Sequence, residues 1–448
     1  MNRVGGLLLA MAIGLAPASA GAQDTVSPPP QEAIAPASQP ITPATDAIAK
    51  LVQQQAPPVV LDVRMGEHAD RTRFVVELSD PVETRIFTLT NPDRVVIDMP
   101  ELLWRVPSGE RPSGKGVVNS YRYGLFRKGN SRFVIDLNQP AKAEDVKIYP
   151  PEGGYGFRLV IDLHRVTPAA FAESAGWPKA DRSTPPGAVA SLPQPALAPQ
   201  PVPGTPESGV PDAKRVIVVD AGHGGVDPGT HGKSGTLEKD IVLGVAAKLA
   251  AALEARGQYR VKLTRDADFF IPLRERVNIA RAARGDLFVS LHVDSISDPS
   301  VRGASIYTLS DQASDREAAK LADKENMSDV IAGVDLAGDN APVALILIDL
   351  AQRDTMNRSA RLAETVLEQL PKATMVRPST PHRSAGFAVL KGPDIPAVLV
   401  ELGYLSNAKD EALMRTDEWR QRVAGAIADA VDRHFEPRQA PSRQASVP

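Results

Sequence analysis

A strand that runs into a glycine-rich turn is predicted for residues 215–229, which are Arg215-Val216-Ile217-Val218-Val219-Asp220-Ala221-Gly222-His223-Gly224-Gly225-Val226-Asp227-Pro228-Gly229. The β-branched run is typical of a buried strand, and the glycines after it favour a turn. A histidine among glycines is seldom there to pack a core. We therefore predict that His223 is a metal ligand.

Two further residues complete a candidate metal site. Glu238 lies at the expected start of a helix, where the helix dipole favours the ionised carboxylate, and His292 follows the apolar run of residues 287–291. Two imidazoles and one carboxylate at strand and helix ends would form a zinc site with one position left for water. Plainer alternatives are a helix-stabilising role for Glu238, a buried core histidine at position 292, and His231 as a weaker substitute ligand for His223.

A general base is predicted at Glu401, which ends the apolar run of residues 395–400. Burial raises the pKa of a carboxylate. A raised pKa suits a group that takes a proton from water and later gives it to a leaving amine. The alternative is a carboxylate that caps a helix or lies in a loop. Near His292, Asp294 is a candidate for orienting a ligand histidine.

The residues around these motifs predict an α/β domain over 214–436, with a mainly parallel sheet flanked by helices. The expected strands cover residues 215–219, 259–263, 287–291, 304–309 and 397–400, and the expected helices start near residue 237 or cover residues 273–284 and 418–435.

An internal repeat indicates a separate all-β domain over residues 57–165. Arg73–Leu78 is echoed by Arg132–Leu137, and Arg94–Met99 is echoed by Arg158–Leu163. Apolar and charged residues alternate within these runs, which suits a sheet with one buried face. Two similar halves predict a small β-sandwich with approximate internal symmetry.

Aromatic and cationic residues gather in one stretch of this domain that we expect to be a loop. They are Tyr121, Arg122, Tyr123, Phe126, Arg127 and Lys128. Such mixtures bind sugars or anionic polymers, and a solvated surface explains them nearly as well.

The remaining segments predict export and flexible connections. Residues 1–22 resemble a cleavable signal peptide with an apolar core too short to span a bilayer. Residues 23–56 predict a disordered leader, residues 166–213 a linker with 11 prolines, and residues 437–448 a disordered tail. A net charge of −3 argues against a nucleic-acid partner, and the absence of cysteine excludes disulfides and thiolate metal sites.

Taken in order, the motifs resemble the zinc-dependent N-acetylmuramoyl-L-alanine amidases of type 3. The matching segments are Val219–Gly225 with Asp227–Gly229, Glu238–Asp240, Ser290–Ser295, and Val400–Tyr404 with Ser406-Asn407. Ala221 stands where that family usually has proline. The resemblance implies that His223, Glu238 and His292 bind zinc, and that Glu401 is the catalytic carboxylate. The implied reaction is hydrolysis of the amide between N-acetylmuramic acid and L-alanine.

Residues 57–165 resemble the AMIN-type peptidoglycan-targeting domain that precedes the periplasmic division amidases of Gram-negative bacteria. This resemblance implies a periplasmic, septal protein whose partner is peptidoglycan. No stretch after residue 22 approaches 18 uninterrupted apolar residues, so we expect no transmembrane segment in the mature form.

An insert over residues 311–350 goes beyond the minimal enzyme. It has a charged, helix-like run, Asp315–Met327, and an apolar run, Ala341–Leu350. In the division amidases such an insert resembles an autoinhibitory helix that an activator protein displaces. We expect an insert carboxylate to cover the zinc: Glu325 first, then Glu317 or Asp315. The alternative is a surface helical hairpin.

Two other functions compete with the amidase. One is a non-catalytic regulator that binds peptidoglycan, and the other is a zinc peptidase that cuts within the stem peptide.

Overall fold

The computed structural model describes residues 56–106, 114–176, 214–334, 348–392 and 394–436. The expected signal peptide, leader and tail lie outside these residues, as do most of the expected linker and most of the apolar run 341–350. In the part of the chain so described, no helix is both long and apolar enough to cross a bilayer.

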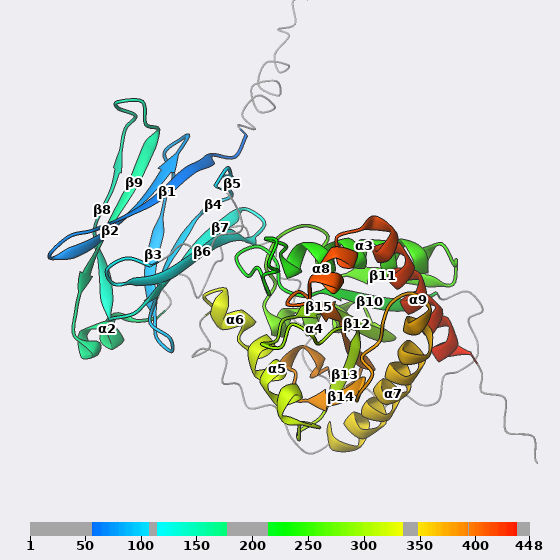
Figure 1. The fold of residues 1–448 in the computed structure, drawn as a ribbon. Helices are drawn as coiled ribbons and strands as arrows, with labels where there is room; N and C mark the ends of the chain where they lie inside the picture. The colour runs from blue at the N-terminus through cyan, green and yellow to red at the C-terminus, as the bar shows by residue number, and fades with distance from the viewer. Residues whose placement is uncertain (1–55, 107–113, 177–213, 335–347, 393, 437–448) are drawn as a thin grey trace, which may run out of the picture. The chain divides into compact units, whose positions relative to one another are not determined.

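The first folded region is a β-sandwich, as the sequence predicts (Figure 1). One sheet has the order β5-β1-β2-β9-β8 and the other the order β3-β4-β7-β6. Their bounds are β1 (Val59–Glu67), β2 (Arg71–Leu78), β3 (Arg85–Leu89), β4 (Arg94–Pro100), β5 (Leu103–Trp104), β6 (Val118–Arg127), β7 (Asn130–Leu137), β8 (Ala141–Tyr149) and β9 (Phe157–Arg165). Apolar side chains from both sheets form one shared core.

The internal repeat is visible as equivalent ion pairs in the two sheets. Arg73 on β2 donates to Asp162 on β9, at 2.8 Å from Nε and 2.7 Å from Nη2. Arg132 on β7 donates to Asp98 on β4 in the same forked manner, at 2.6 and 2.8 Å. Each pair joins the first strand of one repeat to the second strand of the other. The two halves therefore interlock instead of folding side by side.

The stretch of Tyr121 to Lys128 is not a loop, and this prediction was wrong. Residues 118–127 form strand β6, which pairs with β7. Tyr121 and Tyr123 pack in the sandwich core, where burial raises the pKa of Tyr121 to about 12. These two aromatic rings are explained by packing. Their spacing of two residues, which places both rings on one face of a strand, was the available signal.

The expected linker begins later than its prolines indicate. Helix α2 (Pro168–Ser174) follows β9 directly, with Thr167 accepting a hydrogen bond from the amide of Ala170. Proline is well tolerated in the first turn of a helix, where its missing N–H has no partner to lose.

The second region is an α/β domain built on one six-stranded sheet of order β11-β10-β12-β15-β13-β14. The strands are β10 (Arg215–Ala221), β11 (Tyr259–Leu263), β12 (Leu287–Asp294), β13 (Ser305–Leu309), β14 (His382–Ala385) and β15 (Ala397–Tyr404). All neighbouring pairs are parallel except β13 and β15. The sheet is therefore mainly parallel, as predicted.

Helices cover both faces of this sheet. Alternate residues of β10 point to opposite cores: Ile217 and Val219 face helices α3 (Glu238–Glu254), α7 (Ile348–Gln369) and α9 (Asp417–Phe435). Val216 and Val218 face α4 (Leu273–Ala282) and α5 (Arg316–Asn326). Short helices α6 (Ser328–Ile331) and α8 (Ala408–Met414) follow α5 and β15. Helix α5, the charged run of the insert, is thus part of one core layer.

Candidate metal centre and catalytic carboxylate

The turn after β10 brings His223 to the carboxyl edge of the sheet in a strained backbone conformation. Its φ is 56°, in the left-handed region that residues other than glycine seldom adopt. Two buried arginines hold the turn: Arg276 donates to the carbonyl of His223 at 2.8 Å, and Arg265 donates to that of Gly222 at 2.8 Å. A Cβ on Gly222 would lie 2.4 Å from the His292 ring, so the two histidines approach closely only because this residue is glycine.

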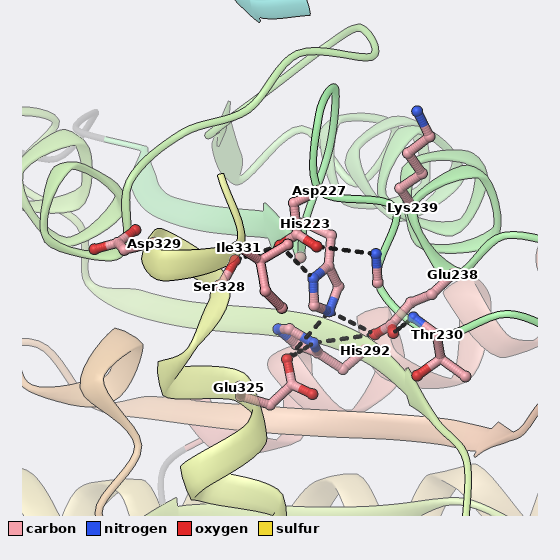
Figure 2. Close-up of polar contacts among 12 residues, drawn as sticks. His223, Asp227, Thr230, Glu238, Lys239, His292, Glu325, Ser328, Asp329 and Ile331 are labelled. Carbon is pink, nitrogen blue, oxygen red and sulfur yellow. Dashed lines mark hydrogen bonds and ion pairs between the residues drawn. The ribbon is translucent and has the colours of Figure 1, made fainter. Parts of the chain in front are cut away.

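Four side chains converge at this edge, from three separate elements and the turn (Figure 2). His223, Glu238 at the start of α3, His292 on β12 and Glu325 on α5 are all buried, with ligand atoms within 4.8 Å of one another. Nε2 of His223 lies 3.1 Å from Glu238 Oε1 and 3.1 Å from Glu325 Oε2. Nδ1 of His292 lies 3.1 Å from the same two oxygen atoms.

Two of these side chains are oriented by groups outside the cluster. Asp227 lies 2.8 Å from Nδ1 of His223, which leaves Nε2 to face the cluster. Glu238 accepts hydrogen bonds from the amides of Thr230 and Val293, each at 2.8 Å. Because the backbone fixes both of its oxygen atoms, the Glu238 carboxylate is set before any ligand arrives.

The cluster fits a zinc ion. His223 Nε2 and Glu325 Oε2 are buried without a hydrogen-bond partner among the described residues, although carboxylate and imidazole atoms surround them. An ion between the four side chains would satisfy these two buried atoms, which otherwise lack a hydrogen bond. A zinc tetrahedron with metal–ligand distances of about 2.0 Å has edges of about 3.3 Å, close to the spacing of these atoms. Two imidazoles and carboxylates are ligands that zinc accepts.

The electrostatics of the cluster favour a cation. Burial lowers the pKa of His223, but Glu238, Asp227 and Glu325 outweigh burial and hold it well above 6.5. For His292 burial is likewise outweighed, mainly by Glu325 and Glu238, and the pKa rises to about 10. The pKa of Glu325 is well below its usual value, because His223 and Lys324 overcome the effect of burial. Such a pocket holds positive charge and keeps its carboxylates ionised.

Glu401 lies beside this cluster, and its pKa is shifted in the opposite direction from that of Glu325. On neighbouring parallel strands His292 and Glu401 are register partners, which places both residues at the same level of the sheet. Glu401 is 0% exposed, and neither of its carboxylate oxygens has a hydrogen-bond partner in the described part of the chain. Burial, reinforced by Asp294, raises its pKa well above 4.5. A carboxyl group with a raised pKa can both take and give a proton near neutral pH.

The insert reaches the cluster through the last turn of α5 and through α6. Figure 2 shows Glu325 and Glu238 approaching the two imidazoles from different sides. Lys324 donates to Thr230 Oγ1 and to Asp294, each at 2.8 Å, and Ser328 donates to Asp227. Three side chains of the insert thus contact the ligands or the groups that surround them.

The other two insert carboxylates named from the sequence lie elsewhere. Asp315 caps α5 by accepting from the amide of Ala318 at 2.9 Å. Glu317 pairs with Arg377 and Arg383. Residue 317 precedes residue 325 by about two helical turns, or roughly 12 Å along the axis. Of the three candidates, only Glu325 is near the histidines.

Sequence reasoning missed several residues that build the site. Asp294 was expected to orient a histidine, but its partner is Lys324, and Asp227 orients His223 instead. The four-residue spacing of His223 and Asp227 within one turn was the available signal. Nothing local marked Arg265 and Arg276, because their role depends on tertiary contacts with the turn.

Comparisons with known proteins show the family to which the chain belongs. Residues 217–433 match the family model described as N-acetylmuramoyl-L-alanine amidase, and residues 61–163 match the AMIN domain. The amidase AmiC of Neisseria meningitidis serogroup B is 34% identical over 405 residues, which cover 88% of this chain and 94% of that protein. The chain belongs to the N-acetylmuramoyl-L-alanine amidase family.

The chain is also similar to other amidases. AmiC of Escherichia coli O6:H1 is 34% identical, with 84% of this chain and 89% of that protein covered. AmiA of Escherichia coli K12 is 38% identical over 50% of this chain and 76% of its own length. Among solved structures, AmiC2 of Nostoc punctiforme is 27% identical with a TM-score of 0.35, covering 50% of this chain and 97% of that one.

Proposed function

We propose that this chain hydrolyses the amide bond between N-acetylmuramic acid and L-alanine in peptidoglycan. The observation that carries the proposal is the meeting of His223, Glu238 and His292 beside a buried Glu401 on the adjacent strand. Membership of the amidase family supports the same reaction. The two alternatives, a non-catalytic regulator and a zinc peptidase, lack this support. A regulator that does not catalyse has no need of a complete cluster, and the name of the matched family refers to the muramoyl amide and not to a bond within the stem peptide.

We further propose that the metal is zinc and that His223, Glu238 and His292 hold it. Zinc there would polarise the carbonyl of the scissile amide and lower the pKa of water to about 7. Asp227 keeps Nε2 of His223 directed at the ion through its contact with Nδ1. The backbone amides of Thr230 and Val293 keep the Glu238 carboxylate in place.

Glu401 moves the proton in this reaction. Its buried carboxyl group has a raised pKa, so the ionised form readily accepts a proton from the attacking water. The same group then delivers the proton to the leaving nitrogen, which departs as the amine of L-alanine. The register pairing of His292 and Glu401 supports this role, since it keeps the carboxyl beside the metal ligands.

The described conformation is proposed to be the resting state. Glu325 supplies a fourth donor atom at 3.1 Å from both histidines, where water and substrate would otherwise bind. Lys324 and Ser328 hold the end of the insert against Asp294 and Asp227. A partner protein that withdraws α5 would then activate the enzyme.

The combination of an AMIN domain and an amidase domain supports a proposal about where the protein acts in the cell. An AMIN domain beside an amidase domain supports a periplasmic protein that binds peptidoglycan and acts in cell-wall remodelling and daughter-cell separation at the septum. A signal peptide over residues 1–22 would provide export.

Digestion of purified sacculi tests the reaction. We expect the zinc-loaded Glu325→Ala variant to release peptides with free L-alanine amino termini and to leave the glycan strands intact, as read by mass spectrometry. Deletion of residues 311–350 is a poorer variant, because α5 buries Leu321 and Ala318 in a core layer. Cleavage inside the stem peptide would favour the peptidase, and zinc binding without any release would favour the non-catalytic regulator.

A further inference from the structure

Two arginines of the catalytic domain bind a carboxylate that the insert supplies. Arg377 donates from Nη1 and Nη2 to the two carboxylate oxygens of Glu317, the second contact being 3.0 Å. Nη1 of Arg383, a residue on β14, lies 2.9 Å from Glu317 Oε1. The Arg383 side chain is only 5% exposed and that of Arg377 12%. A forked contact of this kind is the geometry in which guanidinium groups recognise carboxylates.

The cations of these ion pairs belong to the core of the domain, and the carboxylates belong to the insert. Both arginines lie in the loop and strand that lead towards β15, whereas Glu317 and the more distant Asp315 belong to α5 and its cap. Among the described residues, every ion pair of Arg377 and Arg383 is made with this end of the insert. When α5 leaves, two cationic groups remain with no carboxylate to pair with. Partly desolvated cations without a partner are costly.

We propose that Arg377 and Arg383 form a binding subsite for a carboxylate of the peptide part of the substrate, which Glu317 occupies in the resting state. This inference rests on the proposed function for the identity of the substrate and for the movement of α5. Glu317 and Glu325 then act as a pair, one in place of a substrate carboxylate and the other in place of the reacting group.

Strand β15 connects the subsite with the reaction centre. Arg377 Nη1 donates to the hydroxyl of Tyr404 at 2.9 Å, and Tyr404 follows Glu401 on strand β15. The distance from the arginines to the metal cluster is given by α5, because its carboxylates Glu317 and Glu325 are about 12 Å apart along the helix axis. An extended peptide covers this length in about three to four residues. A carboxylate a few residues from the scissile amide would therefore reach the arginines.

The surface near Arg383 has room for a ligand. A hollow of about 420 Å³ is lined by Asp315, Arg316 and Glu317 of the insert and by Thr380, His382 and Arg383 of the core. Thr380 has a φ of 47°, a strained value for threonine. Arg383 donates to both its carbonyl and its hydroxyl, at 3.1 and 3.2 Å. The core wall of the hollow is thus fixed by Arg383 itself, independently of the insert.

Equilibrium binding to the full-length protein tests the subsite without catalysis. The probes are a synthetic L-Ala-D-Glu-L-Ala tripeptide with free carboxylates and its fully amidated form, measured by calorimetry. Glu317→Gln should bind the acidic tripeptide about 10-fold or more tightly than the wild type, because the competing carboxylate is gone. Adding Arg377→Met should reverse this gain, whereas Arg377→Lys should retain part of it.

Controls separate recognition from folding. Arg433→Met removes an exposed ion pair with Glu368 in the same domain and should leave tripeptide binding unchanged. Thermal unfolding shows whether each variant is folded, and Arg377→Lys keeps the test valid if Arg377→Met is not. Equal binding of the acidic and amidated tripeptides by Glu317→Gln, or undiminished binding after Arg377→Met, would overturn the subsite.

Kinetics on sugar-linked peptides provide a second readout. In a Glu317→Gln/Glu325→Ala background, Arg377→Lys should raise KM about 10-fold for the acidic substrate, with kcat little changed, and leave the amidated substrate unaffected. An equal loss on both substrates would assign the arginine a structural role and overturn the subsite. Absence of any hydrolysis together with carboxylate-selective tripeptide binding would sink the proposed reaction but support the subsite.

Discussion

The edge of the catalytic sheet and the insert present the same chemical groups in different ways. At the sheet edge, Glu238 is held by two backbone amides and Glu401 by its place in strand β15. In the insert, Glu325 and Glu317 meet imidazoles and guanidiniums only through side-chain contacts. The backbone amides stay in place in the folded domain, whereas side-chain contacts can be exchanged for those of a substrate. This difference supports the proposals that the sheet edge carries out the reaction and that the substrate replaces the insert.

We expect the largest effect from a change at Glu401, on the sheet edge. Replacement by Gln keeps the shape but removes the group that carries the proton. In the Glu325→Ala background we expect turnover of peptidoglycan to fall by about 10²- to 10⁴-fold. Zinc content and thermal unfolding should change little, because Glu401 has no described hydrogen bond to lose. Turnover close to that of the background would remove Glu401 from the mechanism.

The Glu325→Ala variant on its own tests whether the insert blocks the metal site. Loss of its contacts with His223 and His292 should shift the population towards the open state and raise basal activity by about 10- to 100-fold. Asp323→Ala is the matched control, since Asp323 is an exposed residue on the same helix. An unchanged rate in a folded Glu325→Ala protein, or an equal rise in Asp323→Ala, would contradict occlusion by Glu325.

The Asp227→Asn variant tests whether Asp227 orients the proposed zinc ligand His223. Asp227 lies 2.8 Å from His223 Nδ1 and also accepts from Ser328. The amide keeps the shape but loses the charge, so zinc affinity should fall by about 10-fold and at most 100-fold. Titration against a competing chelator measures this directly. Ser328→Ala is the contrasting variant, because it removes only the insert's contact and should leave zinc affinity nearly unchanged.

The smallest expected effect is a pH dependence of the Glu317 end of the insert. Hydrogen bonds from Arg377 lower the pKa of Glu317 against the opposing effect of burial. A lowered pKa means that the stabilisation is present above the usual value of 4.5 and is lost as pH falls through the lowered value. Hydrogen exchange of the first turns of α5, corrected for intrinsic rates, should therefore quicken below pH 4.5. In Glu317→Gln this acid dependence should weaken but not vanish, because Asp315, which caps the same turn, also has a lowered pKa. Burial raises the pKa of Asp315, but the hydrogen bond from Ala318 and the charge of Arg383 together outweigh burial. An undiminished dependence would show that Glu317 is not responsible.

Much of the fold was predictable because its signals are local. The β-branched runs at 215–219 and 287–291 predict buried parallel strands, and the repeat of Arg73 and Arg132 predicts two equivalent halves of a sandwich. Strand β6 was mistaken for a loop because its aromatic and cationic residues suggested a binding surface, whereas its tyrosines pack in the core. Packing of this kind depends on the partner sheet, which the local sequence does not reveal.

The site was predictable where its residues lie within motifs and not where they act across the fold. His223, Glu238, His292 and Glu325 could be named in advance, and the structure brings them together. The arginines that hold the turn, and the pairing of Glu317 with Arg377, join segments that are far apart in the chain. No spacing rule connects such residues, so only the folded structure reveals them.

The central claim is that one ion is shared by His223, His292, Glu238 and, in the resting state, Glu325. Anomalous X-ray scattering at the zinc edge, on crystals of the zinc-loaded full-length protein, tests it directly. The account predicts a single strong peak between Nε2 of His223 and Nδ1 of His292, with an oxygen of Glu325 bound to it. A peak elsewhere, or none at this position, would contradict the account.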